Sequence, residues 1–166
     1  MDLMEALMPL APLPYIDEHE TVIEAAAEAV WRALSETLVR SFGGRGATAY
    51  ARLVGASDRT VSGPLPLTEG STLPGFRVTA AARPHELTLS GGHRFSTYTL
   101  TFRLEALTPT RSRLRAESRA AFPGLPGTAY RHLVITTGGH ALGMRRLLTA
   151  VRHGSEQRRT PTRPSP

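Results

Sequence analysis

Two histidines and a tyrosine are the residues of this chain best suited to acid–base chemistry. His140 follows the pair Gly138-Gly139 in a predicted helix, while His93 and Tyr98 belong to a predicted strand–turn–strand segment. Imidazole and phenol groups can carry protons to and from a reacting carbonyl compound. The chain has no cysteine and no lysine, which excludes a thiol nucleophile and a lysine Schiff base. We therefore expect His140, Tyr98 and His93 to be the catalytic candidates, for enolisation, aldol closure or dehydration in a dry cavity.

A second set of residues is predicted to form the wall of that cavity. These residues lie on the inward-facing rows of the predicted strands and on the apolar stripe of the last helix. A few polar groups converging in an apolar cleft are the usual composition of a small-molecule site. The predicted ligand-binding residues are Phe76, Val78, Ser96, Leu100, Phe102, Ser118, Tyr130, Thr137 and Met144.

Each polar candidate also has a purely structural interpretation. His93 lies at the end of a hairpin, where a histidine that is exposed or bonded to the turn is the ordinary situation. Tyr98 could be a core aromatic residue whose hydroxyl is satisfied by a neighbour, and Ser96 and Ser118 could simply fill strand positions. The glycine pair Gly138-Gly139 indicates either close packing, a kink, or room for a ligand beside the helix. The sequence leaves these alternatives open.

Motifs for metals, nucleotides and nucleophilic hydrolysis are not found. The six histidines are scattered, with no pair at i and i+4 on a predicted helix and no histidine–carboxylate cluster. The glycine-rich stretch Ser41–Gly46 follows a predicted helix and lacks the Lys-Ser/Thr of a phosphate-binding loop. We expect no metal site, and the proposed chemistry requires no cofactor.

The last helix, predicted over Thr128–His153, is the element around which the rest is organised. Its apolar residues recur at steps of three or four and form one continuous stripe, as in a helix that lies on a core. Gly154, after the cations Arg152 and His153, is expected to end the helix. The stripe comprises Tyr130, Leu133, Val134, Thr137, Ala141, Met144, Leu148 and Val151.

The region Gly75–Phe122 alternates between apolar and polar residues and predicts antiparallel hairpins with one buried and one wet face. Even-numbered residues from Phe76 to Phe122 are expected to face inward, including Ala80 and Ala82. The row Leu87–His93 is an exception, since its odd-numbered residues face inward.

The first half of the chain is less regular. Tyr15–Ile23 alternates like a strand, but its inward face cannot be assigned. A short helix follows, with Trp31 as a core anchor. Ala47–Val54 is predicted to be a strand, and Gly55–Pro74 is expected to be a binding loop or lid.

Composition limits the remaining possibilities. Of the net charge of +6, residues 1–151 contribute +3 from 16 arginines and 13 acidic residues, and residues 152–166 contribute the other +3. Half of the excess therefore lies in a tail rich in Pro, Thr and Ser, which argues against a nucleic-acid partner. No apolar run is long enough for a membrane span, and the lack of cysteine favours a cytoplasmic location. We expect an N-terminal extension (1–14), one ligand-binding domain (15–153) and a disordered basic tail (154–166), and the sequence gives no indication of oligomeric state.

Three stretches together resemble the SRPBCC/START-like helix-grip superfamily, which includes polyketide cyclases and dehydratases. They are the opening Thr21–Leu34, with its Val30-Trp31 pair, the segment from Gly75 through Tyr98, and the closing helix. An alanine stands where the family usually has a proline, near position 26 or 27. The resemblance covers residues 15 to 152 and implies an α+β fold. A curved antiparallel sheet would wrap around a long C-terminal helix, with one or two short helices after the first strand.

The same resemblance implies an apolar cavity for a hydrophobic small molecule. Within this family such cavities hold sterols, lipids, plant hormones or aromatic polyketides. The resulting hypothesis is a bacterial cyclase, aromatase or dehydratase acting on a polyketide-like substrate. The competing hypotheses are a non-catalytic carrier or sensor, and an interaction module with a filled core. Arg113 and Arg115 are predicted to face outward on a solvated surface, and the alternative is that this face docks an acidic partner such as an acyl carrier protein.

Overall fold

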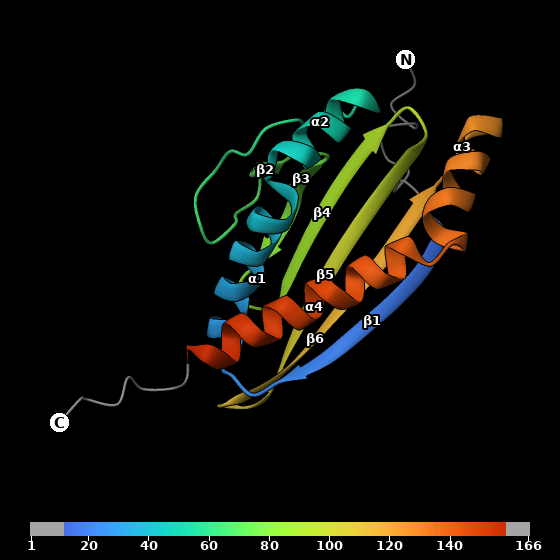
Figure 1. The fold of residues 1–166 in the computed structure, drawn as a ribbon. Helices are drawn as coiled ribbons and strands as arrows, with labels where there is room; N and C mark the ends of the chain where they lie inside the picture. Colours follow the sequence, from blue (N-terminus) through green and yellow to red (C-terminus); the bar gives the residue numbers. More distant parts are fainter. Residues whose placement is uncertain (1–11, 159–166) are drawn as a thin grey trace, which may run out of the picture.

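A curved antiparallel sheet of six strands holds a long helix against its concave face (Figure 1). This computed structural model describes residues 12–158. The strand order is β1-β6-β5-β4-β3-β2. In chain order the elements are β1 (Tyr15–Ile23), α1 (Ala27–Phe42), α2 (Arg45–Leu53), β2 (Thr72–Leu73), β3 (Phe76–Ala82), β4 (Glu86–His93), β5 (Ser96–Thr108), β6 (Arg111–Ala121), α3 (Gly124–Arg131), η2 (His132–Thr136, a turn of π-helix) and α4 (Gly139–Gln157).

The alternating pattern of the long central strands is confirmed. In β5 the buried residues are Ser96, Leu100, Phe102 and Leu104, and in β6 they are Ser112, Leu114, Ala116, Ser118 and Ala120. Their neighbours along each strand are polar and more exposed, so one face of the sheet is wet. The inward row of β4, which begins with Leu87 and Leu89, is also as predicted.

The prediction for Ala80 and Ala82 is wrong because β3 contains a bulge. Val78 pairs with Leu89, but Ala80 pairs with Thr88, so the register shifts between them. A bulge inserts one residue and moves all later side chains to the opposite face. Ala80 and Ala82 are therefore exposed, and Ala81 packs against the core instead.

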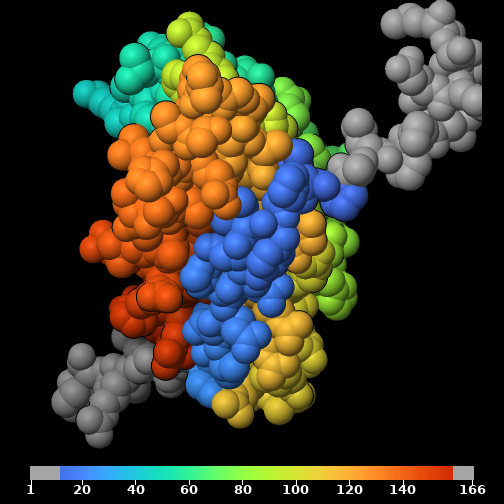
Figure 2. All heavy atoms as spheres, turned by 90° about the vertical axis from the view of Figure 1, so that its right-hand side faces the viewer, coloured from blue at the N-terminus to red at the C-terminus, as the bar shows by residue number. Residues whose placement is uncertain are grey.

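The register of β1 assigns the inward face that the sequence left open. Asp17 pairs with Ser118, His19 with Ala116, and Thr21 with Leu114 of β6. Directly opposed residues in an antiparallel pair share a face of the sheet. Asp17 and His19 therefore lie on the concave side, and Figure 2 shows β1 on the surface between α4 on one side and β6 on the other.

The segment Ala47–Val54 is helical, so the predicted strand is wrong. It forms α2, whose sequence contains three alanines and only one β-branched residue, a composition that favours helix. Ala51 and Val54 are buried there with Ala56. Part of the predicted loop Gly55–Pro74 is ordered by the short strand β2 and by a bridge between Ser62 and Thr72.

The predicted single helix Thr128–His153 is two helices separated by a break. Gly138 has a φ of +79°, a left-handed conformation that stops the preceding π-helical turn and begins α4. Figure 1 shows α4 crossing the concave face while α3 turns away from it. The C-terminal end was also mispredicted, because α4 continues through Gly154 to Gln157. The remainder of the predicted tail and most of the N-terminal extension lie outside the described residues.

Helices α1 and α4 pack against each other and cover one end of the sheet. Trp31 is only 1% exposed, as expected for a core anchor, and its neighbours in this cluster include Leu34, Phe102, Leu114 and Val151. This solid core leaves the other end of the concave face open for a site. Within residues 12–158, no helix has the length and apolar character to cross a membrane.

Candidate functional site

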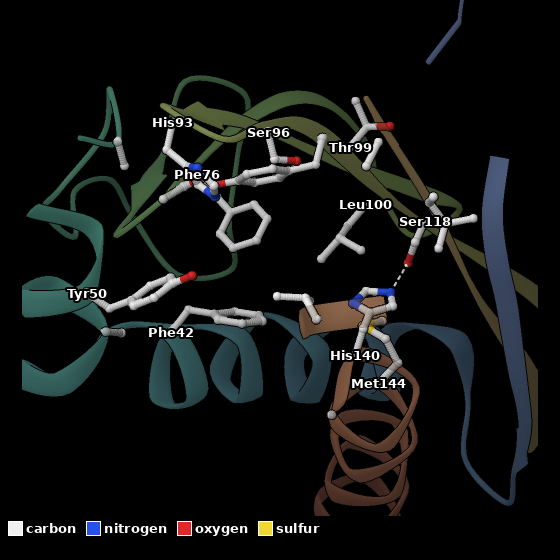
Figure 3. A pocket seen from close by; sticks show the side chains of 18 of the residues that line it. Phe42, Tyr50, Phe76, His93, Ser96, Thr99, Leu100, Ser118, His140 and Met144 are labelled. Carbon is white, nitrogen blue, oxygen red and sulfur yellow. Dashed lines mark hydrogen bonds between the residues drawn. The ribbon is translucent and has the colours of Figure 1, made fainter. Parts of the chain in front are cut away.

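A cavity of about 670 Å³ lies between the concave face of the sheet, α2, η2 and the first turns of α4. Its wall is mostly apolar, with Phe42 from the end of α1, Phe76 from β3, Leu100 from β5 and Met144 from α4. Figure 3 shows Phe42 and Phe76 near Tyr50 and His93, Met144 beside His140, and Leu100 between these two ends. The volume falls within the range usual for small-molecule sites.

Most of the residues predicted for the site meet at this cavity. All three catalytic candidates, His140, Tyr98 and His93, are in its wall. The predicted ligand-binding residues in the wall are Phe76, Ser96, Leu100, Ser118, Tyr130 and Met144.

Three predicted ligand-binding residues lie elsewhere. Val78 and Phe102 face inward, but each is only 1% exposed in the solid core, where α1 and α4 cover the sheet. Thr137 lies at the break before α4 and is exposed. Its hydroxyl donates to the carbonyl of Leu133 in the preceding turn, which directs it to the backbone instead of the cavity.

His93 is both bonded to its turn and part of the cavity wall. The backbone N–H of Phe95 donates to His93 Nδ1 over 3.1 Å, so the proton of the neutral ring belongs on Nε2. The ring of Tyr130 packs edge-on against it, with centroids 4.9 Å apart. Desolvation lowers the pKa of His93, so the ring is neutral at pH 7 and can donate a hydrogen bond through Nε2–H.

Tyr98 is held in place through its hydroxyl group. The hydroxyl donates to the carbonyl of Gly75 over 2.6 Å, and burial raises the pKa of Tyr98 to about 12. The ring lies against Gly91, where a Cβ atom would be only 2.5 Å from the tyrosine ring and 2.0 Å from the Gly75 carbonyl oxygen. The glycine is therefore required for this close approach. With its proton committed, Tyr98 can still accept a hydrogen bond from a ligand.

Tyr50 and Tyr130 join two helices at the same end of the cavity. Their hydroxyl groups form a hydrogen bond between α2 and α3. Burial raises the pKa of Tyr130, with the bond to Tyr50 as a further cause. Tyr50 was not predicted for the site, because the segment that carries it was assigned to a strand.

His140 forms the opposite end of the cavity. Its Nε2 atom lies 3.0 Å from Ser118 Oγ and 3.3 Å from Asp17 Oδ1. The other oxygen of Asp17 is 3.0 Å from Nε2 of His19. In Figure 3 the ring of His140 contacts Ser118 through one nitrogen and turns the other toward the cavity. Sequence reasoning missed Asp17 and His19 because their face of β1 depends on the register with β6.

The arrangement can support proton transfer. A histidine backed by a carboxylate is a suitable general base. The neutral Nε2–H group of His93 at the far end could polarise a carbonyl group. Although Asp17, His19 and His140 are near one another, no group of three acidic, histidine or cysteine residues within 12–158 is arranged to hold a metal ion.

Comparison with known proteins finds similarity in structure only. No family profile matches the sequence, and no curated protein matches it. CalU16 from Micromonospora echinospora superposes with a TM-score of 0.52 at 15% identity, covering 87% of this chain and 76% of that one. Norcoclaurine synthase from Thalictrum superposes with a TM-score of 0.53 at 13% identity, covering 92% and 100%. A conserved protein from Geobacillus kaustophilus gives 0.52 at 13%, covering 84% and 94%.

The chain has the helix-grip fold. The resemblance inferred from Thr21–Leu34, the Gly75–Tyr98 segment and the closing helix is thus confirmed as a statement about architecture. At these identities the superpositions carry no information about ligand or activity. The helix-grip cavity of this chain must be interpreted from its own residues.

The two arginines predicted on the outer face of this helix-grip sheet are paired with acidic residues. Arg113 pairs with Glu105 at 3.1 Å, and Arg115 pairs with Glu20 at 3.1 Å. Pairing of this kind leaves little free charge for a partner. Within the described chain, Arg45, Arg52 and Arg131 of α2 and α3 make no ion pair, and neither helix contains an acidic residue.

Proposed function

We propose that this protein binds a hydrophobic small molecule in the cavity and acts on a polyketide-like substrate as a cyclase, aromatase or dehydratase. The observation that carries the proposal is the placement of His140. Its imidazole faces an apolar cavity of about 670 Å³ and is backed by Asp17, while neutral His93 lies at the other end. Catalysis would need only the residues of the chain and no bound cofactor.

The proposed reaction begins at a carbon between or beside carbonyl groups. His140 Nδ1 takes a proton from that carbon, and the electron pair of the C–H bond moves onto the carbonyl oxygen to form an enolate. The enolate carbon attacks a second carbonyl carbon of the same chain, forming the C–C bond as the C=O π pair moves onto oxygen, and the new alkoxide takes the proton held by His140 to give a ring with a hydroxyl group. In dehydration, His140 removes a second proton from the carbon beside the hydroxyl-bearing carbon, the C–H electron pair forms a C=C bond as the C–O bond breaks, and the histidine gives its proton to the leaving hydroxyl to form water.

The cavity would act mainly by folding a flexible chain so that its reacting carbons meet, which is a proximity effect. The Nε2–H group of His93 would donate to a carbonyl oxygen along that chain, and Tyr98 would accept from a hydroxyl group of the ligand. Support from the comparisons is limited to the fold. One helix-grip structure, norcoclaurine synthase, was solved with a transition state analogue, so the fold does host an enzyme in that case.

A non-catalytic carrier or sensor is the second candidate. It is favoured by the mostly apolar wall and by the hydroxyl groups of Tyr98 and Tyr130, which are bonded to protein groups. Under this alternative His140 would contribute hydrogen bonding to the ligand and no proton transfer.

An acyl carrier protein remains the proposed donor of a tethered substrate. Arg45, Arg52 and Arg131 are exposed on α2 and α3, have no ion pair among the described residues, and would supply positive charge for an acidic carrier near the cavity. The paired arginines of the outer sheet face, which the sequence suggested, offer less.

The test is conversion of a linear poly-β-ketone thioester, with cyclic products measured by chromatography and mass spectrometry. His140→Gln should lower the turnover about 100-fold or more, because a general base contributes factors of this size. His132→Gln is the matched control, since His132 is exposed on η2 and is not part of the wall. If the wild-type protein binds the thioester but forms no cyclic product, the carrier is correct. Unchanged turnover in His140→Gln would remove His140 as the base.

A further inference from the structure

The carboxylate of Asp17 lies between two imidazole rings that come from different parts of the chain. Oδ2 is 3.0 Å from Nε2 of His19 on the same strand, and Oδ1 is 3.3 Å from Nε2 of His140 on α4. The three side chains are 25%, 16% and 21% exposed. In the described chain, the ion pairs of Asp17 are with these two histidines alone.

The geometry decides which nitrogen of His140 carries the proton. Asp17 Oδ1 is buried and has no well-aligned hydrogen bond among the described residues, so its contact with Nε2 at 3.3 Å is a close approach of two polar atoms. If Nε2 held a lone pair, it could accept from the Ser118 hydroxyl, but it would also lie 3.3 Å from a buried carboxylate oxygen, and the two negative sites would repel each other. If Nε2 carries a proton, Ser118 Oγ accepts it at 3.0 Å, and the same N–H lies beside the carboxylate oxygen, so its positive end attracts that oxygen. The Nε2–H tautomer is therefore the favoured one.

We propose that Asp17 is a positioning residue that holds His140 in the Nε2–H tautomer, with the Nδ1 lone pair directed into the cavity. His19 occupies the second oxygen of the carboxylate and keeps it from rotating away. The carboxylate also stabilises the imidazolium ion that forms when Nδ1 takes a proton. What Nδ1 does with a substrate rests on the proposed function, but the tautomer does not.

This assignment narrows the class of substrate. A lone pair at Nδ1 suits a carbon acid, whose C–H bond lies beside a carbonyl group and gives up its proton. It does not suit a substrate that must be protonated first, because a neutral ring in the Nε2–H tautomer has no proton on the cavity side. We expect an enolisable β-dicarbonyl unit to bind at the His140 end of the cavity, with the remaining chain directed toward His93.

The tautomer can be measured without any substrate. Long-range ¹H–¹⁵N NMR of ¹⁵N-labelled protein at about pH 8, where an ordinary histidine is neutral, distinguishes Nδ1–H from Nε2–H rings. His19→Gln and His140→Gln assign the two ring signals. In the wild-type protein both rings should carry the proton on Nε2.

Asp17→Asn is the test variant. The amide has an oxygen on one side and an NH₂ group on the other, so it can accept from only one of the two rings. The ring that meets the NH₂ group must present a lone pair there and shift its proton to Nδ1. Glu18→Gln is the matched control, because Glu18 is the next carboxylate along β1, pairs with Glu117 and lies on the outer face. It should leave both tautomers unchanged.

A second variant separates the two neighbours of Nε2. Ser118→Ala should keep the Nε2–H tautomer of His140, since Asp17 remains. The inference is overturned if wild-type His140 carries its proton on Nδ1, if Ser118→Ala changes the tautomer, or if folded Asp17→Asn leaves both rings as they were.

Kinetics with the poly-β-ketone thioester distinguish this inference from the proposed function. Asp17→Asn should lower kcat about 100-fold with little change in KM, whereas a merely structural role would raise KM as the cavity distorted. If the tautomers respond as described but the wild-type protein forms no product, the positioning role stands and the proposed reaction fails.

Discussion

His93 and His140 lie at opposite ends of one cavity, and the chain holds them for different tasks. His93 accepts a backbone hydrogen bond at Nδ1 and is packed among aromatic rings, which leaves a neutral Nε2–H donor. His140 is placed beside a carboxylate and a serine hydroxyl at Nε2, which leaves Nδ1 for the cavity. The two imidazole rings therefore present different nitrogens to a ligand: Nε2 in His93 and Nδ1 in His140.

The burial of His93 predicts a dependence of stability on pH. Desolvation lowers the pKa of His93 in the folded state below the value of about 6.5 that it has when unfolded. Above that value His93 is neutral in both the folded and the unfolded protein, and its protonation does not reduce the free energy of unfolding. As the pH falls below about 6.5, the unfolded state takes up the proton first, so the free energy of unfolding decreases.

His93→Gln should therefore lose less stability than the wild-type protein between about pH 7.5 and pH 5, measured by urea unfolding at each pH. His85→Gln is the control, because His85 is an exposed residue between β3 and β4. It should retain the full loss seen in the wild type. A pH dependence of His93→Gln that parallels the wild type would show that His93 is not shielded from solvent.

At the residue scale, the sequence predicted the polar groups that alternate along regular strands. Ser96, Tyr98 and Ser118 followed from parity alone, and His140 from the helical stripe. Asp17 and His19 did not, because a strand with mixed residues on both faces has no readable inward side until its partner is known. Val78 and Phe102 point inward as predicted. They lie in the packed core and not in the cavity, because the alternation of residues along a strand does not show which part of the concave face the helices cover.

The break between η2 and α4 is the element that most affects the site. Gly138 adopts a left-handed conformation, so the helix that would otherwise run on from η2 stops and restarts in a new direction. His140 is then in the first turn of α4, from which it reaches Ser118 on β6. The change of direction at the break thus places His140 both beside Asp17 of β1 and in the cavity wall.

Two glycine substitutions in this region should have opposite effects. Gly138→Ala should lower the free energy of unfolding by about 1–2 kcal/mol, because a side chain strains a left-handed residue even with open space around it. Gly143→Ala, also with nothing within 4 Å of a new Cβ atom, should raise it by about 1 kcal/mol, since it lies inside α4 with an ordinary helical backbone.

Urea unfolding of both variants and the wild type provides the comparison. A stabilising effect of Gly138→Ala would mean that the helix continues through this residue, and the placement of His140 would need another explanation.

At the element scale, strong periodicity predicted the long strands, α1 and the presence of a C-terminal helix. It could not show the bulge at β3, since an inserted residue leaves no trace in a run of small residues such as Thr79–Ala82. Ala47–Val54 was mispredicted because short alternation over alanines resembles a strand, while the low cost of alanine in a helix decides the outcome. The pair Gly138-Gly139 indicates either close packing, a kink or room for a ligand, and the structure shows a break at Gly138.

The whole molecule divides the concave face into two regions. Helices α1 and α4 fill one end with a solid core, and α2, η2 and the start of α4 enclose the cavity at the other. This division argues against an interaction module with a completely filled interior. It also explains how a chain of this size combines a stable core with a cavity of about 670 Å³.

The cavity is the central claim, and methyl NMR tests it most directly. Protein with ¹³C-labelled leucine and methionine methyl groups would be titrated with 1-anilinonaphthalene-8-sulfonate, a fluorescent anion whose aromatic rings bind apolar cavities. Leu100 and Met144 line the cavity, whereas Leu53 and Leu125 are 75% and 86% exposed on α2 and α3 and serve as internal controls. We predict saturable one-to-one binding that shifts the signals of Leu100 and Met144. Shifts confined to Leu53 and Leu125, with Leu100 and Met144 unmoved, would contradict a cavity that accepts a ligand.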